Sequence, residues 1–562
     1  MHDFAIRGAT VFDGLGNPGI SADVYIKDGR ISGIGKLNES ARDSVNASGL
    51  ALMPGIVDTH THFDAQVTWD RTLSPSPALG VTTVVVGNCG FGIAPCPADQ
   101  RELMLKNLSV VEGMDLNALL SGVTWQFESF SQYMDQLRAI GPYPNMAVFA
   151  GHSVIRTAVM GEAAATDAQP TAGQIKAMVR QVQEAMDAGA IGFASSFSPN
   201  HSGYGGQPMP STIACEQELR ALVNVLGERK SGVFMMATGS RANPEFMESV
   251  AQQTGRPTFI STVLAMYNEG TPELALTYYE KCAAAQARGN PLYMLTSCQP
   301  LSFDFSLEDP YILISHSAFD AVQGLDREAA KHVYTSQGFR QQFRDNLASP
   351  KSGVLFLGNW NQIELGKSST GQFERHEGKN MQQIAAAQGK DPLDVFFDMA
   401  VTEDLKTGFV GKFFNNDDAG VAPLLKHPAG VISLSDAGAH LIYMCDAGFG
   451  LHFLGHWVRE MREFTLQEGI RRLTSHPAQR FRIADRGRLV QGAPADLLLF
   501  DPATVGISRL RQVEDFPGGT SRMVRDPVGV HGVWVNGTQV HDGKNYITLN
   551  YGPGQVLTRF LS

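Results

Sequence analysis

Two histidines one residue apart, His60 and His62, follow an apolar run in the segment GIVDTHTHFDAQ at residues 55–66. Side chains alternate between the two faces of a strand, so we expect both imidazoles to point to the same side of the chain. Two imidazoles on one side can bind a single metal ion. The alternative is that both are hydrogen-bonded loop histidines, so other residues must decide between metal binding and a structural role.

Two further polar residues stand at the ends of apolar runs. Cys89 ends the run in VVVGNCGFG between glycines, which permit the tight turns that expose a side chain at a site. Asp436 follows the run in GVISLSDAGAH, where an aspartate is otherwise a turn or helix-cap residue. A carboxylate beside a Lewis-acidic metal can hold the attacking water and accept its proton. Asp436 is therefore our predicted catalytic base and acid.

The elements that must position these residues are short apolar runs separated by helical patterns such as the one at 171–189. Continuous apolar runs mark strands that are buried on both faces, as in parallel sheets. Eight runs of strand length occur, at residues 50–58, 81–89, 145–151, 190–196, 232–238, 257–263, 291–297 and 430–436. They predict an α/β fold, a (β/α)8 TIM-like barrel, in which active sites assemble at the carboxyl ends of the strands.

The two chain ends have a different pattern. Both alternate apolar and polar residues and carry turn signals such as DG and GNP. We predict that residues 1–53 and 485–562 form one small composite β-sandwich and that residues 54–484 form the barrel. The long interval at about 298–429, between the last two barrel strands, predicts a lid-like insertion that closes over the site.

Composition limits the partners. The chain has 562 residues, of which 43% are hydrophobic and 18% charged, and its formal net charge is -11. An acidic chain disfavours nucleic acid and anionic membranes as partners, because both need clustered Lys and Arg. The start has no signal-peptide pattern, and no run of about 18 apolar residues occurs. We expect a cytoplasmic protein with a small-molecule substrate, and the sequence leaves an oligomer open.

Several segments together resemble a known family. They are PGIVDTHTHFD, GVTTVVVGNCGFGIAP, SDAGAH, LTSHPAQRF and GRLVQGAPADLLLFDP. In this order they resemble the amidohydrolase superfamily, and GNCGFGIAP resembles the N-acyl-D-amino-acid deacylases (D-aminoacylases). The resemblance implies a metal-dependent hydrolase that cleaves the C–N amide bond of an N-acylated amino acid, with zinc as cofactor, one or two divalent ions. It further implies that His60, His62 and Asp436 bind the first metal and that the Cys89 thiolate can bridge to a second.

The sequence departs from that family at two strand ends. In the family the fifth and sixth strands each end in a histidine, and these histidines with the cysteine hold the tightly bound zinc. Here the corresponding ends read VFMMATGSR and TFISTVLAMY and contain no histidine. The second site is then absent or completed by residues from elsewhere. One metal remains chemically sufficient, because a single zinc can lower the pKa of water to about 7 and polarise a carbonyl.

Four residues are candidates for substrate contact. His152 and Arg156 follow the third run. If they do not contact substrate, His152 would support neighbouring site residues and Arg156 would lie on the surface. Tyr204 lies in the loop where the family has a substrate-contacting tyrosine. The alternative role for Tyr204 is that of an exposed loop aromatic without a substrate contact. His440 in SDAGAH could orient Asp436 or the acyl group, or cap the following helix. His201, in the same loop as Tyr204, is expected to be solvated.

Three other functions are weighed against deacylation. An amidohydrolase that opens a cyclic imide, hydantoin or lactone would use the same metal set. A catalytically silent binding protein is the second, and the missing histidines motivate it. A nucleotide-dependent enzyme or an oxidoreductase is the third. It is disfavoured because the chain has neither a GxGxxG after a first strand nor a GxxxxGK[ST] segment.

Overall fold

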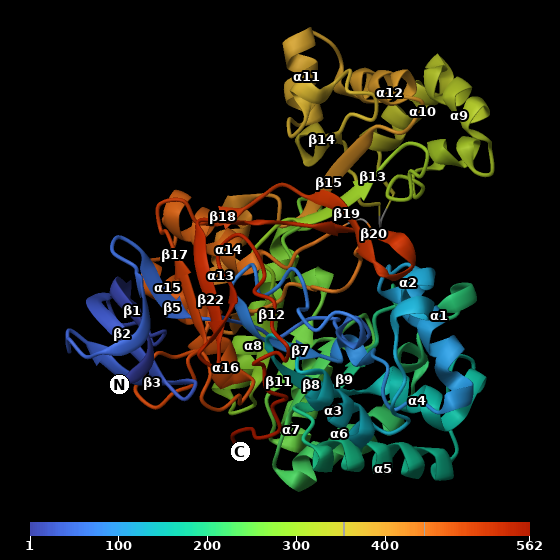
Figure 1. Cartoon of the computed structure of the whole chain (residues 1–562). Helices are drawn as coiled ribbons and strands as arrows, with labels where there is room; N and C mark the ends of the chain where they lie inside the picture. The colour runs from blue at the N-terminus through green and yellow to red at the C-terminus, as the bar shows by residue number, and fades with distance from the viewer. Residues whose placement is uncertain (352–353, 443) are drawn as a thin grey trace. The chain divides into compact units, whose positions relative to one another are not determined.

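The computed structural model describes residues 1–351, 354–442 and 444–562, which fall into two compact units (Figure 1). The first unit comprises Met1–Ala265, Leu274–Cys298 and Ala422–Ser562. The second comprises Met266–Glu273 and Gln299–Val421. The first unit contains every residue that the sequence nominates for catalysis or metal binding.

A parallel sheet of eight strands is the centre of the first unit. Its strands are β6 (Ile56–Asp58), β7 (Val81–Val86), β8 (Asn145–Gly151), β9 (Gly192–Ser196), β10 (Val233–Ala237), β11 (Thr258–Ser261), β12 (Leu292–Thr296) and β16 (Gly430–Ile432). They follow one another in chain order around the sheet. The N–H of Thr59 donates to the carbonyl oxygen of Ser433 at 3.2 Å, and this bond joins the first strand to the last. The predicted α/β barrel is confirmed, and each predicted run contains its strand.

Helices alternate with these strands along the chain. They are α1 (Arg101–Val111), α2 (Leu116–Gly122), α3 (Phe130–Ile140), α4 (His152–Met160), α5 (Ala172–Ala188), α6 (Glu216–Arg229), α7 (Pro244–Thr254), α8 (Pro272–Ala287), α13 (Asp418–Lys426), α14 (Phe449–His452), α15 (Leu466–Leu473) and α16 (Ser475–Arg480). Helix α5 shows how the sequence sets their limits. It begins with a capping box between Thr171 and Gln174 and ends at Gly189 with φ of 99°.

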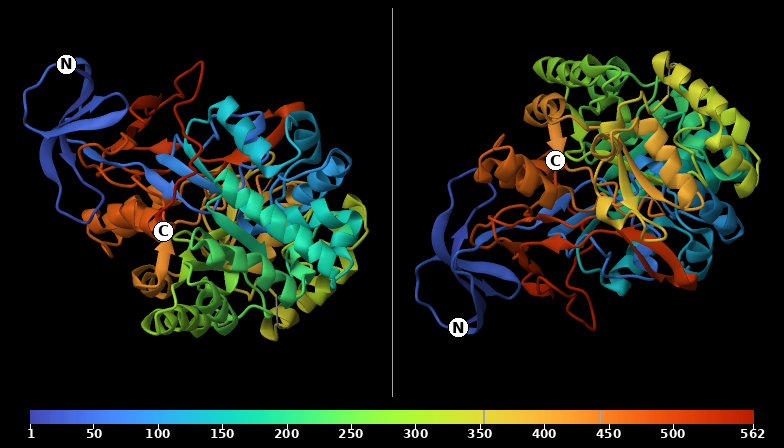
Figure 2. Two further views of the ribbon diagram at one scale, coloured as in Figure 1. Left: turned by 90° about the horizontal axis from the view of Figure 1, so that it is seen from below. Right: turned by 90° about the horizontal axis from the view of Figure 1, so that it is seen from above.

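Strands from both chain ends share a second sheet (Figure 2). Its strands are β1 (His2–Val11), β2 (Ile20–Lys27), β3 (Arg30–Gly35), β4 (Ala41–Asn46), β5 (Ala51–Pro54), β17 (Leu497–Phe500), β22 (Val530–Val535) and β23 (Thr538–His541). Strand β17 runs antiparallel to β5, with Leu499 opposite Leu52. Two hairpin-like pairs, β18 (Gly506–Ile507) with β21 (Pro527–Val528) and β19 (Arg511–Phe516) with β20 (Thr520–Val524), complete the strands of this unit. The β-sandwich and its limits at residues 53 and 485 stay a prediction.

The second unit is an insertion between β12 and β16 with a core of its own. Its three-stranded antiparallel sheet consists of β13 (Leu301–Phe305), β15 (Gly408–Phe414) and β14 (Ile363–Lys367). Its helices are α9 (Arg327–Thr335), α10 (Gln337–Ala348), α11 (Met381–Gln388) and α12 (Pro392–Thr402). Aromatic side chains such as Phe343, Phe396 and Phe409 are fully buried in its core. Its predicted role as a lid stays a prediction.

A buried carboxylate, Glu403, fixes one loop of this second unit. Its oxygens accept hydrogen bonds from the hydroxyls of Thr370 at 2.7 Å and Thr407 at 2.8 Å, and from the Ser369 N–H at 2.9 Å. The Ser368 hydroxyl donates to the same carboxylate. Burial raises the pKa of Glu403, but these hydrogen bonds outweigh it and lower the pKa to about 2.

We expect Glu403→Gln to destabilise this unit by about 1–3 kcal/mol, because a neutral amide replaces an acceptor that serves five donors, the Thr370 N–H at 3.2 Å among them. The lowered pKa means that this stabilisation is present above the ordinary pKa of 4.5 and lost as the pH falls toward 2. Amide hydrogen exchange of residues 368–373 should be faster in the variant at neutral pH. The exposed Glu374→Gln is the control, and equal exchange in all three proteins would contradict the assignment.

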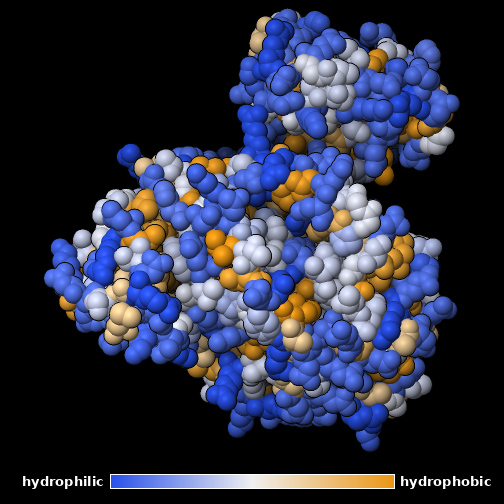
Figure 3. Space-filling view, in the orientation of Figure 1, coloured by the Kyte–Doolittle hydropathy of each residue, from blue (hydrophilic) through white to orange (hydrophobic). Residues whose placement is uncertain are grey.

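Among the described residues, no helix is long and apolar enough to cross a membrane. On the face drawn in Figure 3, hydrophobic residues are scattered among hydrophilic ones. Scattered exposed apolar residues are ordinary on protein surfaces and indicate no particular partner.

Candidate metal centre

His60 and His62 extend beyond β6 and flank Thr61, whose backbone pairs with a neighbouring strand. The Thr61 N–H donates to the carbonyl oxygen of Val85 at 3.1 Å, and the His62 N–H donates to that of Ala437 at 2.7 Å. This pairing keeps strand-like alternation past the end of β6, so the two imidazoles share one side, as predicted. Their ring centroids are 5.3 Å apart, and both side chains are buried.

Cys89 and Asp436 both lie in tight turns with left-handed backbones, at φ of 55° and 56°. Such a conformation is uncommon outside glycine and concentrates at functional sites. The turn around Cys89 depends on Gly90, because a Cβ there would lie 2.8 Å from the carbonyl oxygen of Ala194. The turn of Asp436 is held by its N–H, which donates to the carbonyl oxygen of His60 at 3.0 Å.

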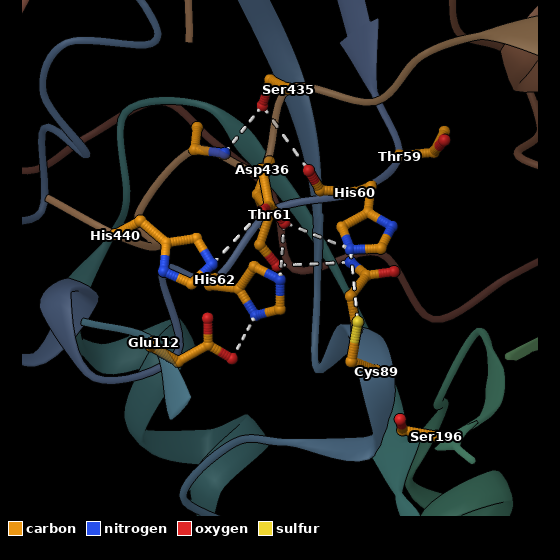
Figure 4. A network of polar contacts seen from close by, with 12 residues as sticks. Thr59, His60, Thr61, His62, Cys89, Glu112, Ser196, Ser435, Asp436 and His440 are labelled. Carbon is orange, nitrogen blue, oxygen red and sulfur yellow. Dashed lines mark hydrogen bonds and ion pairs between the residues drawn. The ribbon is translucent and has the colours of Figure 1, made fainter. Parts of the chain in front are cut away.

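The side chains of these four residues converge on one point (Figure 4). Nε2 of His60 lies 3.5 Å from Sγ of Cys89 and 3.4 Å from Oδ1 of Asp436. Nε2 of His62 lies 3.0 Å from the same oxygen. In a tetrahedral zinc site with bonds of about 2.0 Å to nitrogen and 2.3 Å to sulfur, a nitrogen and a sulfur ligand are about 3.6 Å apart. The donor set therefore fits zinc in type and in spacing.

Two of the donors, His60 and Asp436, have the protonation states that metal binding requires. Burial lowers the pKa of His60 to about 3, which keeps its imidazole neutral. Burial raises the pKa of the Cys89 thiol to about 11, so a metal that binds Sγ has to displace a proton. Burial raises the pKa of Asp436 too, but the hydrogen bond and charge of His62 outweigh it and hold this pKa well below its ordinary value. Asp436 is therefore a carboxylate.

Sequence reasoning missed Glu112, which lies just after α1 and contacts His62 (Figure 4). Nδ1 of His62 is 2.9 Å from Oε1 of Glu112, and both side chains are buried. Burial lowers the pKa of His62, but the charge of Glu112 leads the opposing effects and raises this pKa well above its ordinary value. A carboxylate at Nδ1 fixes the tautomer in which Nε2 faces the other donors. No sequence pattern indicated this contact.

A second buried carboxylate, Asp58, supports the turn that carries Asp436. The Ser435 hydroxyl donates to Asp58, and the Ala437 N–H donates to Oγ of Ser435 at 2.9 Å. Burial raises the pKa of Asp58 to about 8. These contacts tie the end of β6 to the end of β16, so His60 and Asp436 are held by one network.

His152 and Arg156 lie away from the surface and bind a common partner. Nδ1 and Nε2 of His152 lie 2.8 Å from Oγ of Ser195 and 3.0 Å from Oε1 of Glu218. The guanidinium of Arg156 donates to Oε2 of Glu218 at 3.3 Å. Both side chains are fully buried, and their contact with a substrate stays a prediction. The supporting role that was the alternative for His152 fits its contacts, and the surface position considered for Arg156 is wrong.

Tyr204 and His440 differ in their relation to the donors. Tyr204 is 51% exposed, and its ring faces Nζ of Lys106 at 4.9 Å, as expected for an exposed loop aromatic. His440 does reach the site, because its Nε2 lies 3.8 Å from Oδ2 of Asp436 and its N–H donates to the carbonyl oxygen of Glu112. The helix-capping alternative for His440 is wrong, since the next helix that the described residues form, α14, is capped by Gly448.

A (β/α)8 barrel with two histidines, a cysteine and an aspartate at its strand ends defines the class of metal-dependent barrel hydrolases. Residues 43–541 match the amidohydrolase family, and the chain belongs to that family.

Similarity to characterised relatives extends over the whole chain. A D-aminoacylase of Alcaligenes xylosoxydans xylosoxydans is 29% identical over 566 residues, which cover 99% of this chain and 98% of the relative. The crystal structure of an N-acyl-D-glutamate deacylase from Bordetella bronchiseptica, complexed with zinc and a phosphonate mimic of the tetrahedral intermediate, is 27% identical with a TM-score of 0.65. It covers 99% of this chain and 100% of its own. A D-aminoacylase structure concerned with a binuclear metal centre, one-metal activation and second-metal attenuation is 26% identical over 100% of both chains, with a TM-score of 0.64.

Proposed function

We propose that the protein hydrolyses the amide bond of N-acyl-D-amino acids and that it uses one divalent metal ion, zinc, to do so. The observation that carries the proposal is the convergence of His60, His62, Cys89 and Asp436 at the strand ends of the barrel. The substrate class is taken from two relatives that are similar along the whole chain, a D-aminoacylase and an N-acyl-D-glutamate deacylase.

The reaction adds water to the amide carbon and releases a carboxylate and an amine. When bound, zinc supplies a water of lowered pKa and polarises the scissile carbonyl. Asp436 is ionised and accepts the proton of the attacking water at a carboxylate oxygen. It then returns the proton to the departing nitrogen. Nε2 of His440, 3.8 Å from Oδ2 of Asp436, helps to keep that carboxylate in place.

The residues at the ends of the fifth and sixth strands are evidence for one metal ion per chain rather than two. β10 and β11 end beside Thr238 and Ser261, where the Thr238 N–H donates to the carbonyl oxygen of Ser261 at 3.0 Å. Neutral hydroxyls are poor zinc ligands compared with imidazole or thiolate. Among the described residues, the only cluster with the composition of a metal site contains His60, His62 and Cys89. One-metal activation in a D-aminoacylase is in keeping with this stoichiometry.

We expect Glu112→Ala to weaken zinc binding by about 10–100-fold, because His62 loses the group that fixes its tautomer. Glu112→Gln should lose less zinc affinity than Glu112→Ala, since its amide oxygen can still accept a hydrogen bond from Nδ1 of His62. Competition against a metal chelator measures both affinities. Glu102→Ala on the exposed side of α1 is the matched control, and a Glu112→Ala affinity equal to that of the control would contradict the role of Glu112.

The proposed function is tested with zinc-loaded protein and a substrate panel. The panel contains N-acetyl and longer N-acyl derivatives of D- and L-amino acids, together with hydantoins, cyclic imides and lactones. Release of free amino acid from the D-series supports the proposal. Ring opening alone would overturn it in favour of the cyclic substrates, and stoichiometric zinc without turnover of any compound would favour a silent binding protein.

A further inference from the structure

His201 occupies a position that its sequence context did not indicate. It lies in the loop after β9, where its N–H donates to the carbonyl oxygen of Ser198 at 3.2 Å and its carbonyl oxygen accepts from the Met209 N–H at 3.0 Å. Its ring packs edge-on against Phe91, with centroids 5.0 Å apart. Phe91 follows the turn that carries Cys89, so the expectation that His201 is simply solvated is wrong.

The tautomer of His201 follows from its bond to Ser196, the last residue of β9. Nδ1 of His201 lies 2.7 Å from Oγ of Ser196, which also accepts from the Ser198 N–H at 3.1 Å. Ser196 is fully buried, and a buried hydroxyl donates its proton to an available acceptor. Nδ1 is the only acceptor for this hydroxyl among the contacts of the described residues. Nδ1 therefore accepts, and Nε2 carries the hydrogen.

The ring of His201 lies beside two elements next to the metal donors. Phe91 is two residues after Cys89, and Ser196 ends β9, which packs against the turn that carries Cys89. Nε2, on the other side of the ring from Nδ1, has no hydrogen-bond partner among the described residues, and it is not one of the fully enclosed unpaired atoms. Burial lowers the pKa of His201 to about 4, so the ring is neutral at physiological pH. The other groups whose charges act on this pKa belong to the metal site: Glu112, His440, Asp436 and His62. In turn, His201 influences His60.

We infer that His201 is a further catalytic residue, which donates a hydrogen bond from Nε2 to the oxyanion that develops on the scissile carbonyl, and that Ser196 is its positioning residue. This inference rests on the proposed amide hydrolysis. A neutral donor fixed before the reaction stabilises charge that appears only in the transition state. The role differs from metal binding, because His201 lies outside the cluster formed by His60, His62 and Cys89.

Kinetics of His201→Ala and His201→Gln on an N-acyl-D-amino acid test the catalytic role. We expect His201→Ala to lose roughly 10²–10³-fold in kcat with KM and zinc content unchanged. His201→Gln should recover part of the loss, because its amide N–H can take the place of Nε2–H. His531→Ala, at an exposed histidine of β22, is the control. A higher KM with unchanged kcat, or a loss of zinc, would overturn the assignment.

A tetrahedral phosphonate analogue of the substrate gives a readout without turnover. His201→Ala should bind it roughly 10²–10³-fold more weakly than wild type, and should bind the D-amino acid product equally well. Equal phosphonate affinity in the two proteins would overturn the oxyanion role.

The positioning role of Ser196 requires that it act through His201. Ser196→Ala should lower kcat less than His201→Ala does, and the double variant should match His201→Ala alone. Additive losses would overturn this role. The two proposals fail separately: a wild-type enzyme that hydrolyses no N-acyl-D-amino acid overturns the proposed function and with it the role of His201. An active wild type with an equally active His201→Ala overturns only the role of His201.

Discussion

Replacement of Asp436 by asparagine should lower kcat by roughly 10²–10⁴-fold, the range that a positioned general base contributes. The reason is that the carboxylate is ionised in the folded protein and lies within 3.4 Å of both Nε2 atoms of the metal site. An amide in its place cannot accept the proton of the attacking water, whereas its oxygen can still face the metal. We therefore expect zinc content near that of wild type.

Asp485→Asn is the matched control for this experiment. Asp485 is exposed, and its φ of 59° resembles the 56° of Asp436, so any cost of asparagine in a left-handed backbone is shared. Steady-state kinetics and elemental analysis are measured on all three proteins. Wild-type kcat in Asp436→Asn would contradict the catalytic role, and loss of zinc with kcat per bound zinc preserved would reduce Asp436 to a ligand.

Replacement of Cys89 should remove the metal. Cys89→Gly deletes the thiolate and also suits the φ of 55° at this position, so a loss of zinc in this variant cannot be ascribed to backbone strain. We expect zinc affinity to fall by more than the roughly 100-fold that loss of an outer partner costs, because a direct ligand is removed. Hydrolysis should fall with the bound zinc.

Cobalt gives this variant a spectroscopic readout. Cobalt-loaded wild type should show a thiolate-to-metal charge-transfer band, and Cys89→Gly should lack it. Cys282→Ala, at a buried cysteine of α8, is the control and should keep both the band and the zinc. Persistence of the band in Cys89→Gly would show that another cysteine is the ligand.

The fold and the four donors could be predicted from sequence because local rules determine them. A strand buried on both faces reads as a continuous apolar run, and each of the eight runs contains its barrel strand. The one-residue spacing of His60 and His62 places them on one side of any extended chain. The glycines beside Cys89 and after Asp436 mark turns at strand ends.

The remaining site residues could not be predicted because their contacts join distant segments. Glu112 reaches His62 from beyond α1, and no periodicity relates the two. Arg156 was a candidate for substrate contact with a surface position as the alternative, and neither interpretation anticipated its partner Glu218, which is 62 residues away. Tyr204 and His201 share one loop, and the hydrogen bond from Ser196 holds His201 at the end of β9 while Tyr204 is exposed.

The most direct test of one-metal amide hydrolysis is a zinc titration of the metal-stripped protein, with hydrolysis of an N-acyl-D-amino acid followed at each addition. Activity should rise in proportion to the zinc added and reach its maximum at one equivalent per chain, without a further gain from a second. Activity that needs two equivalents, or no hydrolysis at any zinc loading, would contradict the proposed mechanism.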